Sequence, residues 1–386
     1  MEEMNELTIE NFTLDFEMNN TVIEAFLELL RCGTRDKQPQ TKYFTKLSEQ
    51  DWFLIFNMIK MQSVVGVCLQ PTLDLPIELR PPRLLLLQWG AYRNYIKAQN
   101  ERYKDVWTKL QAIFAEGEVY PVILKGLAVS TCYAHPEYRE AGDIDLYFPE
   151  KYEEGLQQLI KHGIEIEYDT VHKEHDKIEV DGIEIELHKN FANVPFEIIL
   201  PHQKRHLQLG ETDLLTSDID STALLLLLHP VKHLFSSGVG IRHLCDWALF
   251  LEKYKDQINT ETVINETKRL GMYTFVRCFT TLACQRLGVK LEEDSPWTQN
   301  TRQNIADFMF KDMIVRGDFG KLADAMRKKW FPYYIKSTKR VFKYYLCWPE
   351  YFWKRIPRKM FRRFVGILVG RPYGVHTPKY KKPKQG

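Results

Sequence analysis

The sequence has no long uninterrupted hydrophobic run and no paired-cysteine motif, and each absence excludes a class of protein. Its apolar runs, such as Leu224–Leu228 and Phe364–Val369, are far shorter than the roughly 20 residues of a membrane-spanning helix. The first ten residues, MEEMNELTIE, are acidic and lack the basic and apolar regions of a secretory signal peptide. Seven scattered cysteines form no CxxC pair and no zinc-like array. We therefore expect a cytoplasmic protein whose cysteines are reduced, buried thiols.

A net charge of only +2 conceals an uneven distribution of charge along the chain. From Arg327 to the C-terminus there are 18 lysines and arginines and one acid, Glu350, whereas the preceding residues carry 35 basic and 50 acidic residues. Large aromatic residues alternate with the bases of this tail. Three explanations remain open: an anionic membrane surface, a nucleic-acid backbone with stacked bases, or aromatics packed on the acidic body.

The chain divides by pattern into four parts, and there are no internal repeats. We expect an N-terminal helical region over 1–115, an α/β core over 116–210, a C-terminal helical region over 211–326 and a basic aromatic tail over 327–386. A single apolar stripe from Trp89 to Ile113 predicts one long helix after Pro81-Pro82. Ser48, with Asp51 three residues on, is a plausible cap of an earlier helix. Strands are expected in the core at Val122–Leu124, 143–148, Ile164–Tyr168, Lys177–Val180 and 183–188, with a hairpin turn at Asp181-Gly182.

Two aspartates in the expected strand 143–148 are the strongest functional signal. Side chains alternate along a strand, so Asp143 and Asp145 point to one face while Ile144 and Leu146 point to the other. Two carboxylates so close repel each other unless a cation neutralises them. A hard divalent ion with oxygen ligands, such as Mg²⁺, is the usual solution, so the pattern predicts a metal site.

A third carboxylate can come from the alternating segment Ile183–His188. It places Glu184, Glu186 and His188 on one face, and pairing with the aspartate strand would bring an acid to the metal site. Three carboxylates around two cations suit in-line displacement at phosphorus. We expect Glu184 to lie at a solvated position of the strand and not to bind the metal. His188 could contact the substrate or merely cap the end of the strand. Upstream, Lys125-Gly126 follows a strand and offers a cation and close backbone approach to anionic oxygens.

These residues resemble a known family. The run Ile123-Leu124-Lys125-Gly126, then Tyr133, Pro136, Arg139 and Gly142–Leu146, then Ile185–His188, is similar to the uncharacterised nucleotidyltransferase family of the polymerase-β-like superfamily, frequent in bacteria near surface-polysaccharide genes. The resemblance implies an α+β fold: a minimal nucleotidyltransferase core, a mixed sheet with flanking helices, between N- and C-terminal helical regions. It also implies transfer of a nucleoside monophosphate from a nucleoside triphosphate to an acceptor hydroxyl, with Mg²⁺ or Mn²⁺.

Carried over residue by residue, the resemblance assigns Asp143, Asp145 and Glu186 to catalysis and metal binding. Gly126 matches the glycine that opens the nucleotide-binding turn, but Leu127 follows it where the superfamily commonly has serine or glycine. Nucleotide binding is therefore assigned to Lys125, Gly126, Arg139 and the nearest serine, Ser130. His188 and Asp246 are candidate substrate contacts, although Asp246 could instead anchor a helix.

Several alternatives accompany this interpretation. The chain could be a catalytically silent scaffold that binds nucleotide, or a toxin-like enzyme that modifies RNA or protein. The histidine pairs His172/His175 and His229/His233 have zinc-like spacing but no accompanying ligand pattern, so we expect solvated or core histidines. Because polysaccharide assembly begins on lipid carriers, the resemblance places a membrane ahead of nucleic acid as the partner of the tail, with the protein at the periphery of the inner membrane.

Overall fold

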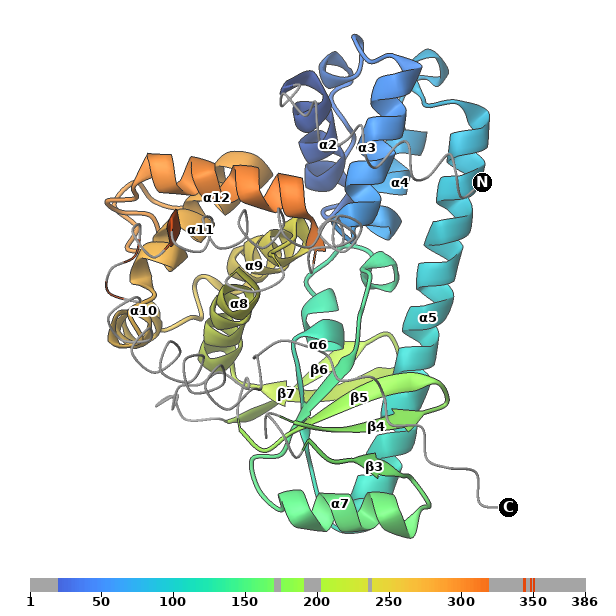
Figure 1. Ribbon diagram of the computed structural model, residues 1–386, viewed down its shortest axis with the longest axis vertical. Coiled ribbons are helices and arrows are strands. Elements are labelled where there is room, and N and C mark those ends of the chain that lie inside the picture. The colour runs from blue at the N-terminus through green and yellow to red at the C-terminus, as the bar shows by residue number, and fades with distance from the viewer. Residues whose placement is uncertain are drawn as a thin grey trace, which may run out of the picture.

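The computed structural model describes residues 20–169, 175–190, 203–234 and 238–318, together with positions 343, 344, 348 and 350. A block of helices lies at one end of this chain and a seven-stranded sheet at the other, with a second group of helices between and beside them (Figure 1). The long helix α5 (Arg83–Ala115) runs past both the first block and the sheet. The predicted α+β class, a mixed sheet between two helical regions, is confirmed.

The N-terminal helical region forms as its end signals predict. It contains α2 (Asn20–Gly33), η1 (Thr41–Tyr43), α3 (Glu49–Met61), α4 (Val65–Leu73) and η2 (Ile77–Leu79), all before α5. Helix α3 begins with a capping box, because the Ser48 hydroxyl accepts a hydrogen bond from the Asp51 backbone N–H and the Asp51 carboxylate accepts one from that of Ser48. Helix α5 begins directly after Pro82 and buries the expected stripe, including Trp89 and Leu110.

The mixed sheet has the order β3-β4-β5-β2-β1-β7-β6. Its strands are β1 (Val122–Leu124), β2 (Ile144–Tyr147), β3 (Ile166–Glu167), β4 (Asp176–Val180), β5 (Ile183–His188), β6 (Lys204–Leu209) and β7 (Thr212–Ser217). Strand β2 lies parallel to β5 and antiparallel to β1, which is parallel to β7; the remaining neighbours are antiparallel. The β4–β5 hairpin turns where predicted, with Asp181 and Gly182 both at positive φ, as a type I′ turn requires. Between these strands lie α6 (Gly126–Ser130), η3 (Pro136–Tyr138) and α7 (Tyr152–Lys161).

The expectation that helical structure resumes at residue 211 is wrong. Strands β6 and β7 form a hairpin around Gly210, which has φ +63°, and β7 joins the sheet beside β1. The sheet therefore extends to Ser217. The apolar run Leu224–Leu228 lies in the next helix, and the prediction extended the helical region of that run too far toward the N-terminus. The polar residues of β7 show little of the alternation that marks a strand.

The two faces of the sheet have different roles. Ile144, Leu146, Ile185 and Leu187 pack against α5 and α7 in one hydrophobic core. Tyr147 and the β1 side chains Val122 and Leu124 belong to a second core that includes the N- and C-terminal helices. Asp145 shares the face of Tyr147, so the predicted division into a core face and a functional face is confirmed within β2, whereas Asp143 lies just before the strand.

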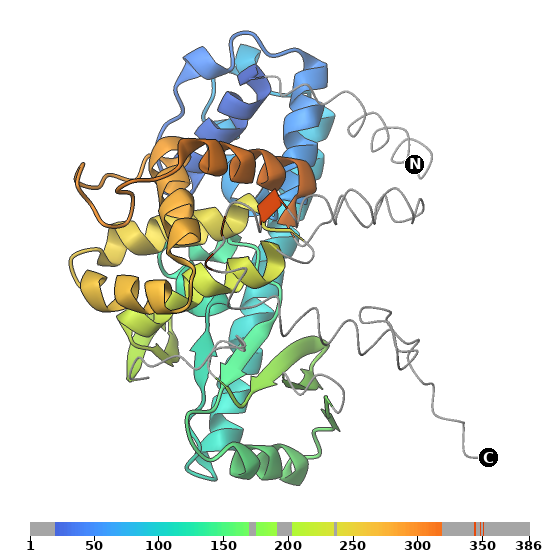
Figure 2. The ribbon, with the colours of Figure 1, turned by 60° about the vertical axis from the view of Figure 1, so that its left-hand side comes forward.

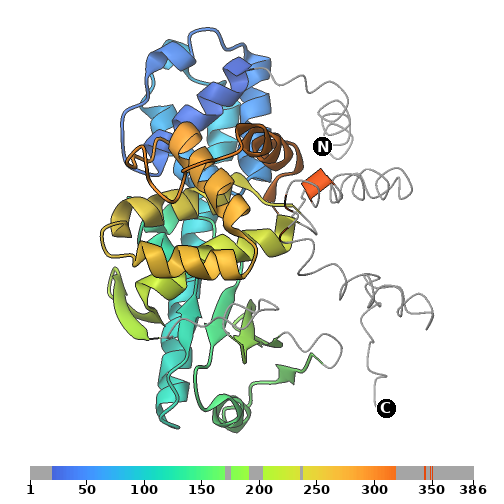
Figure 3. The same ribbon diagram turned by 90° about the vertical axis from the view of Figure 1, so that its left-hand side faces the viewer.

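The C-terminal helices pack on this second face and against the N-terminal block (Figures 2 and 3). They are α8 (Ile219–Leu234), α9 (Ile241–Tyr254), α10 (Thr260–Arg269), α11 (Tyr273–Leu287) and α12 (Gln303–Arg316). Of the basic aromatic tail, only Lys343, Tyr344, Trp348 and Glu350 lie within the described residues. Tyr344 and Trp348 are buried, against Phe308 and Phe275 respectively, so these two aromatics pack on the body. Membrane or nucleic-acid binding by the tail stays a prediction on residues outside those described.

Two expectations from composition agree with the structure. In the described residues, no helix is long and apolar enough to cross a membrane. The six cysteines in this part of the chain are free thiols, four of them buried.

Candidate active site

The register between β2 and β5 builds the candidate active site. The two strands run parallel with Asp145 opposite Glu186 and Tyr147 opposite His188. Because facing residues of paired strands lie on the same side of the sheet, Glu186 and His188 join Asp145 on its functional face. The predicted pairing of the two strands is confirmed, and it brings the Glu186 carboxylate beside Asp145. Glu184, expected to be solvated, has a side chain 59% exposed and pairs with Lys177.

Three ligand-type side chains converge at this register. Asp145, Glu186 and His188 each offer an atom within 4.8 Å of those of the other two. The Nε2 atom of His188 lies 3.0 Å from Asp145 Oδ1 and 3.6 Å from Glu186 Oε2. Asp145 is only 2% exposed, whereas Glu186 is more open to solvent. His188 therefore belongs to the cluster of possible metal ligands, whereas the sequence predicted a substrate contact or a strand end.

Asp143 lies just before β2, beside this group of three but outside it. Its neighbour Asp145 and partial burial raise the pKa of the Asp143 carboxyl above the usual value. Within the described residues its carboxylate makes no hydrogen bond or ion pair. A carboxylate in this position is the member of the set most available to a bound cation or substrate.

Lys125 supplies the positive charge nearest to these acids. Its Nζ atom lies 2.9 Å from Asp145 Oδ2. Burial disfavours the ammonium form, but the attraction of Asp145 and Asp143 prevails and raises the pKa of Lys125. Burial likewise opposes ionisation of Asp145, but Lys125 and the hydrogen bond from His188 hold its pKa well below the usual range. The ion pair keeps Asp145 charged.

The backbone at Lys125 is strained. Its φ of 48° and ψ of −136° are rarely adopted by a residue with a side chain, and cost on the order of 1–3 kcal/mol. Gly126 follows with φ +44° and opens α6, as the glycine of a nucleotide-binding turn would. Ser130, at the other end of α6, is buried and its hydroxyl donates to the Leu127 carbonyl oxygen at 2.6 Å. The Ser130 hydroxyl is therefore engaged within its own helix.

Two basic side chains at the site were missed by sequence reasoning. The Nε2 atom of His175 lies 3.0 Å from Glu186 Oε1, and Lys177 Nζ lies 3.6 Å from the same oxygen. Burial opposes ionisation of Glu186, but the hydrogen bond from His175, with nearby His188, lowers its pKa. The position of Lys177 can be predicted from the sequence, because the two-residue turn at Asp181-Gly182 sets a register in which Lys177 lies opposite Glu186. His172 lies outside the described residues.

Arg139 and Asp246 lie together in a buried pair. Arg139 donates from Nε to Asp246 Oδ1 at 2.8 Å and from Nη2 to Asp246 Oδ2 at 2.7 Å, and the Tyr133 hydroxyl donates to Oδ1 at 2.7 Å. Both charged side chains are 7% exposed or less. Asp246 therefore anchors α9, the second of the two roles expected of it. Only Nη1 of Arg139 makes no hydrogen bond among the described residues, so the predicted nucleotide contact rests on that one nitrogen.

Side chains from both helical regions hold the segment that leads into Asp143. From α5, Asn100 Nδ2 donates to the Arg139 carbonyl at 2.9 Å and the Tyr103 hydroxyl to that of Gly142 at 2.7 Å. From α9, Arg242 Nη1 donates to the Glu140 carbonyl at 3.0 Å. The aspartate strand thus starts from a segment fixed on two sides.

A comparison with known protein families accords with this geometry. Residues 48–288 match the family described as "Uncharacterised nucleotidyltransferase". The chain belongs to this nucleotidyltransferase family. The match includes α3 to α11 and every site residue described above. No curated protein and no solved structure matches the chain.

The donor set of this nucleotidyltransferase fits a divalent cation. Two carboxylates and an imidazole within 4.8 Å of one another offer hard oxygen ligands and one nitrogen, and Asp143 lies alongside. Lys125 and His175 hold the acids ionised, which is the form that binds metal. The residues are therefore suited to a cation such as Mg²⁺ or Mn²⁺.

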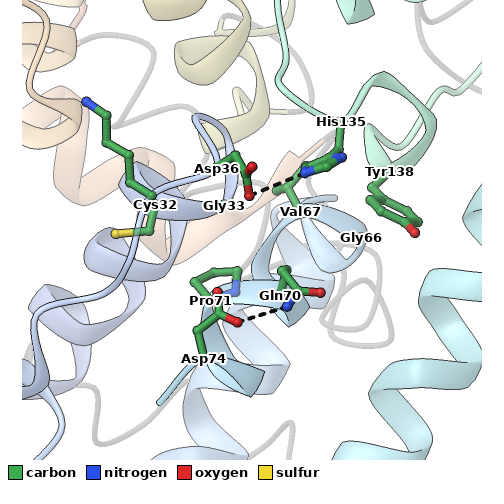
Figure 4. A pocket seen from close by; sticks show the side chains of 11 residues that line it. Cys32, Gly33, Asp36, Gly66, Val67, Gln70, Pro71, Asp74, His135 and Tyr138 are labelled. Carbon is green, nitrogen blue, oxygen red and sulfur yellow. Dashed lines mark hydrogen bonds and ion pairs between the residues drawn. The ribbon is translucent and has the colours of Figure 1, made fainter.

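A small pocket lies elsewhere in the nucleotidyltransferase, between α2, α4 and the segment before η3 (Figure 4). Its polar lining includes Asp36, Asp74 and His135. His135 Nε2 lies 3.3 Å from Asp36 Oδ1. No residue of the carboxylate centre lines this pocket, so the two sites are distinct.

The pair of Arg139 and Asp246 gives the nucleotidyltransferase an acid-sensitive contribution to stability. Burial alone would raise the pKa of Asp246, but Arg139 prevails and lowers it. The unfolded chain then binds the proton more readily than the folded one. The contribution is complete above the unfolded pKa of about 4 and is lost as pH falls through the lower folded pKa. In thermal unfolding between pH 7 and pH 3, we expect the difference in Tm between the wild type and Asp246→Asn to shrink below about pH 4. A constant difference would contradict the assignment.

Proposed function

We propose that this protein is a divalent-metal-dependent enzyme that transfers a nucleoside monophosphate from a nucleoside triphosphate to an acceptor hydroxyl. The observation that carries the proposal is the parallel register that sets Asp145 opposite Glu186 and brings His188 to both. Membership of a nucleotidyltransferase family supports the same reaction class. The acceptor we favour is a sugar hydroxyl of a surface-polysaccharide precursor, with the enzyme in the cytoplasm or at the inner face of the membrane.

In this proposal Asp143, Asp145 and Glu186 hold the cation, assisted by His188. A bound divalent cation supplies positive charge that stabilises the attacking and leaving oxygens. Lys125 donates to an oxygen of the triphosphate, because its ammonium lies beside the carboxylates that would hold the cation. We leave Ser130 out of this set, because its hydroxyl is bonded within α6.

The covalent step follows from these positions. The acceptor hydroxyl oxygen forms a bond to the α-phosphorus, the bond from that phosphorus to the bridging oxygen breaks, and pyrophosphate leaves. Glu186 accepts the proton of the acceptor hydroxyl; it is more open to solvent than Asp145, and it remains ionised. His175 and Lys177, 3.0 and 3.6 Å from Glu186 Oε1, hold that carboxylate in place.

A mass-spectrometric screen tests the proposal. The protein is incubated with each nucleoside triphosphate and Mg²⁺ against sugars, phosphosugars, antibiotics, RNA and the protein itself. We expect an acceptor to gain the mass of one nucleotide and EDTA to abolish the gain. Nucleotide binding without any transfer, unaffected by Mg²⁺ or by Asp145→Asn in calorimetric titration, would instead favour the catalytically silent scaffold. The Lys125–Asp145 ion pair is the observation in favour of that second candidate, because it neutralises Asp145 without a metal. Modification of RNA or of the protein itself would favour the toxin-like enzyme.

A further inference from the structure

The turn at Lys125-Gly126 lacks the hydroxyl that commonly faces a triphosphate. Leu127 follows Gly126, and the Ser130 hydroxyl donates to the Leu127 carbonyl. Lys125 is thus the polar side chain that this turn directs at the carboxylate centre, and its ammonium is already engaged by Asp145. A triphosphate carries several charged oxygens, so further donors must come from another element.

Helix α8 places two imidazoles on the other side of Lys125. The Nε2 atom of His229 lies 3.2 Å from Lys125 Nζ, and the Nε2 atom of His233, one helical turn on, lies 3.0 Å from that of His229. Both histidines are half-buried. The ring of His243 on α9 lies 5.5 Å from the His229 ring. Lys125 therefore links the carboxylates on β2 to a histidine cluster in the C-terminal helices.

The hydrogen-bonding roles at this point favour an anion. An ammonium can only donate, so His229 Nε2 must accept from Lys125. The facing Nε2 atom of His233 is then the donor, because two lone pairs at 3.0 Å would repel each other. Lys125 and His233 both donate toward one spot, where a phosphate oxygen is a stronger acceptor than a neutral imidazole.

A metal ion fits this spot less well than an anion. The ammonium of Lys125 lies 3.2 Å from His229 Nε2 and would repel a cation bound there. Among the described residues, the three metal-binding side chains that come together are Asp145, Glu186 and His188, and none of them belongs to α8. The histidine pair therefore lies outside the metal-ligand cluster found among the described residues.

We propose that Lys125 and His233, with His229 positioned between them, bind the β- and γ-phosphates of the nucleoside triphosphate, the part that leaves as pyrophosphate. This inference rests on the proposed function. It assigns to α8 the task that the glycine-serine turn performs in relatives, and it explains why two histidines with i, i+4 spacing lie beside the catalytic lysine. It also places the leaving group on the C-terminal helices and the acceptor on the side of Glu186.

Binding measurements on single variants test the inference. The protein, His229→Leu and His233→Leu are titrated calorimetrically with Mg²⁺ and the α,β-methylene analogues of ATP, GTP, CTP and UTP, and with the corresponding monophosphates. We expect each variant to bind the preferred triphosphate analogue about tenfold more weakly and the monophosphate within about twofold of wild type. His233→Lys, which retains a donor, is expected to keep most of the triphosphate affinity. His206→Leu is the matched control, because His206 is 70% exposed on the β6–β7 hairpin.

The outcomes separate this inference from the function on which it rests. Thermal unfolding checks that each variant is folded. If the variant of one histidine does not fold, the variant of the other histidine provides the test. If the wild type binds no triphosphate, both proposals are wrong. If Asp145→Asn loses binding while both histidine variants retain it, only the role of α8 is wrong. An equal loss of triphosphate and monophosphate affinity would also overturn it, since that points to the shape of the site and not to the outer phosphates.

Discussion

Asp145→Asn is expected to reduce nucleotidyl transfer about a hundredfold to a thousandfold while the fold is retained. Asp145 is the acid that contacts both Lys125 and His188 and faces Glu186 across the strand pair. An amide removes the charge that a divalent cation needs, and loss of a single charge-stabilising group at a reaction centre commonly costs 10²–10³-fold. Pyrophosphate release with the preferred nucleoside triphosphate and Mg²⁺ measures the effect. Asp143→Asn is expected to give a comparable loss.

The matched control lies on the same strand as Glu186. Glu184→Gln makes the same chemical change on β5, but at a side chain that is 59% exposed and bonded to Lys177. Its activity is expected to stay within about twofold of wild type. Circular dichroism and thermal unfolding check that the asparagine variants are folded. Full activity of folded Asp145→Asn would show that the carboxylate centre is not the site of transfer.

Arg139→Met is expected to destabilise the protein by about 3–5 kcal/mol, because it leaves Asp246 buried without its cation. The pair has two charge-assisted hydrogen bonds, 2.8 and 2.7 Å long, and almost no exposure. The pair joins the segment before Asp143 to α9. Its removal therefore weakens the contact between the sheet and the C-terminal helices. Denaturant unfolding followed by tryptophan fluorescence measures the change in free energy of unfolding.

Two further variants identify the cause. Arg139→Met combined with Asp246→Leu removes both charges and is expected to regain part of the loss. Lys109→Met breaks the exposed pair of Lys109 with Asp181, whose side chains are 51% and 61% exposed, and is expected to change stability by less than about 1 kcal/mol. If Arg139→Met resembles Lys109→Met in stability but weakens nucleotide binding, Arg139 acts through Nη1 on the ligand, as the family resemblance implies, and not as an anchor.

The hairpin at Asp181-Gly182 shows how far local rules extend. A two-residue turn imposes one register, so Lys177 opposite Glu186 follows from the sequence alone. By contrast, the polar pattern of β7 is too weak to signal a strand, and only its position beside β1 shows that it belongs to the sheet. Register within a hairpin is a local property, whereas the choice of neighbours in a mixed sheet depends on the whole chain.

By itself the sequence determined the family, the helix caps and the shared face of Asp143 and Asp145, because each depends on residues a few positions apart and on the period of a strand or helix. Only the tertiary structure decided that Arg139 meets Asp246, 107 residues away, and that His229 on α8 reaches Lys125, 104 residues away. Such contacts arise where separate helices pack on one face of the sheet. No spacing along the chain encodes them, since packing depends on the shapes and burial of all the elements together.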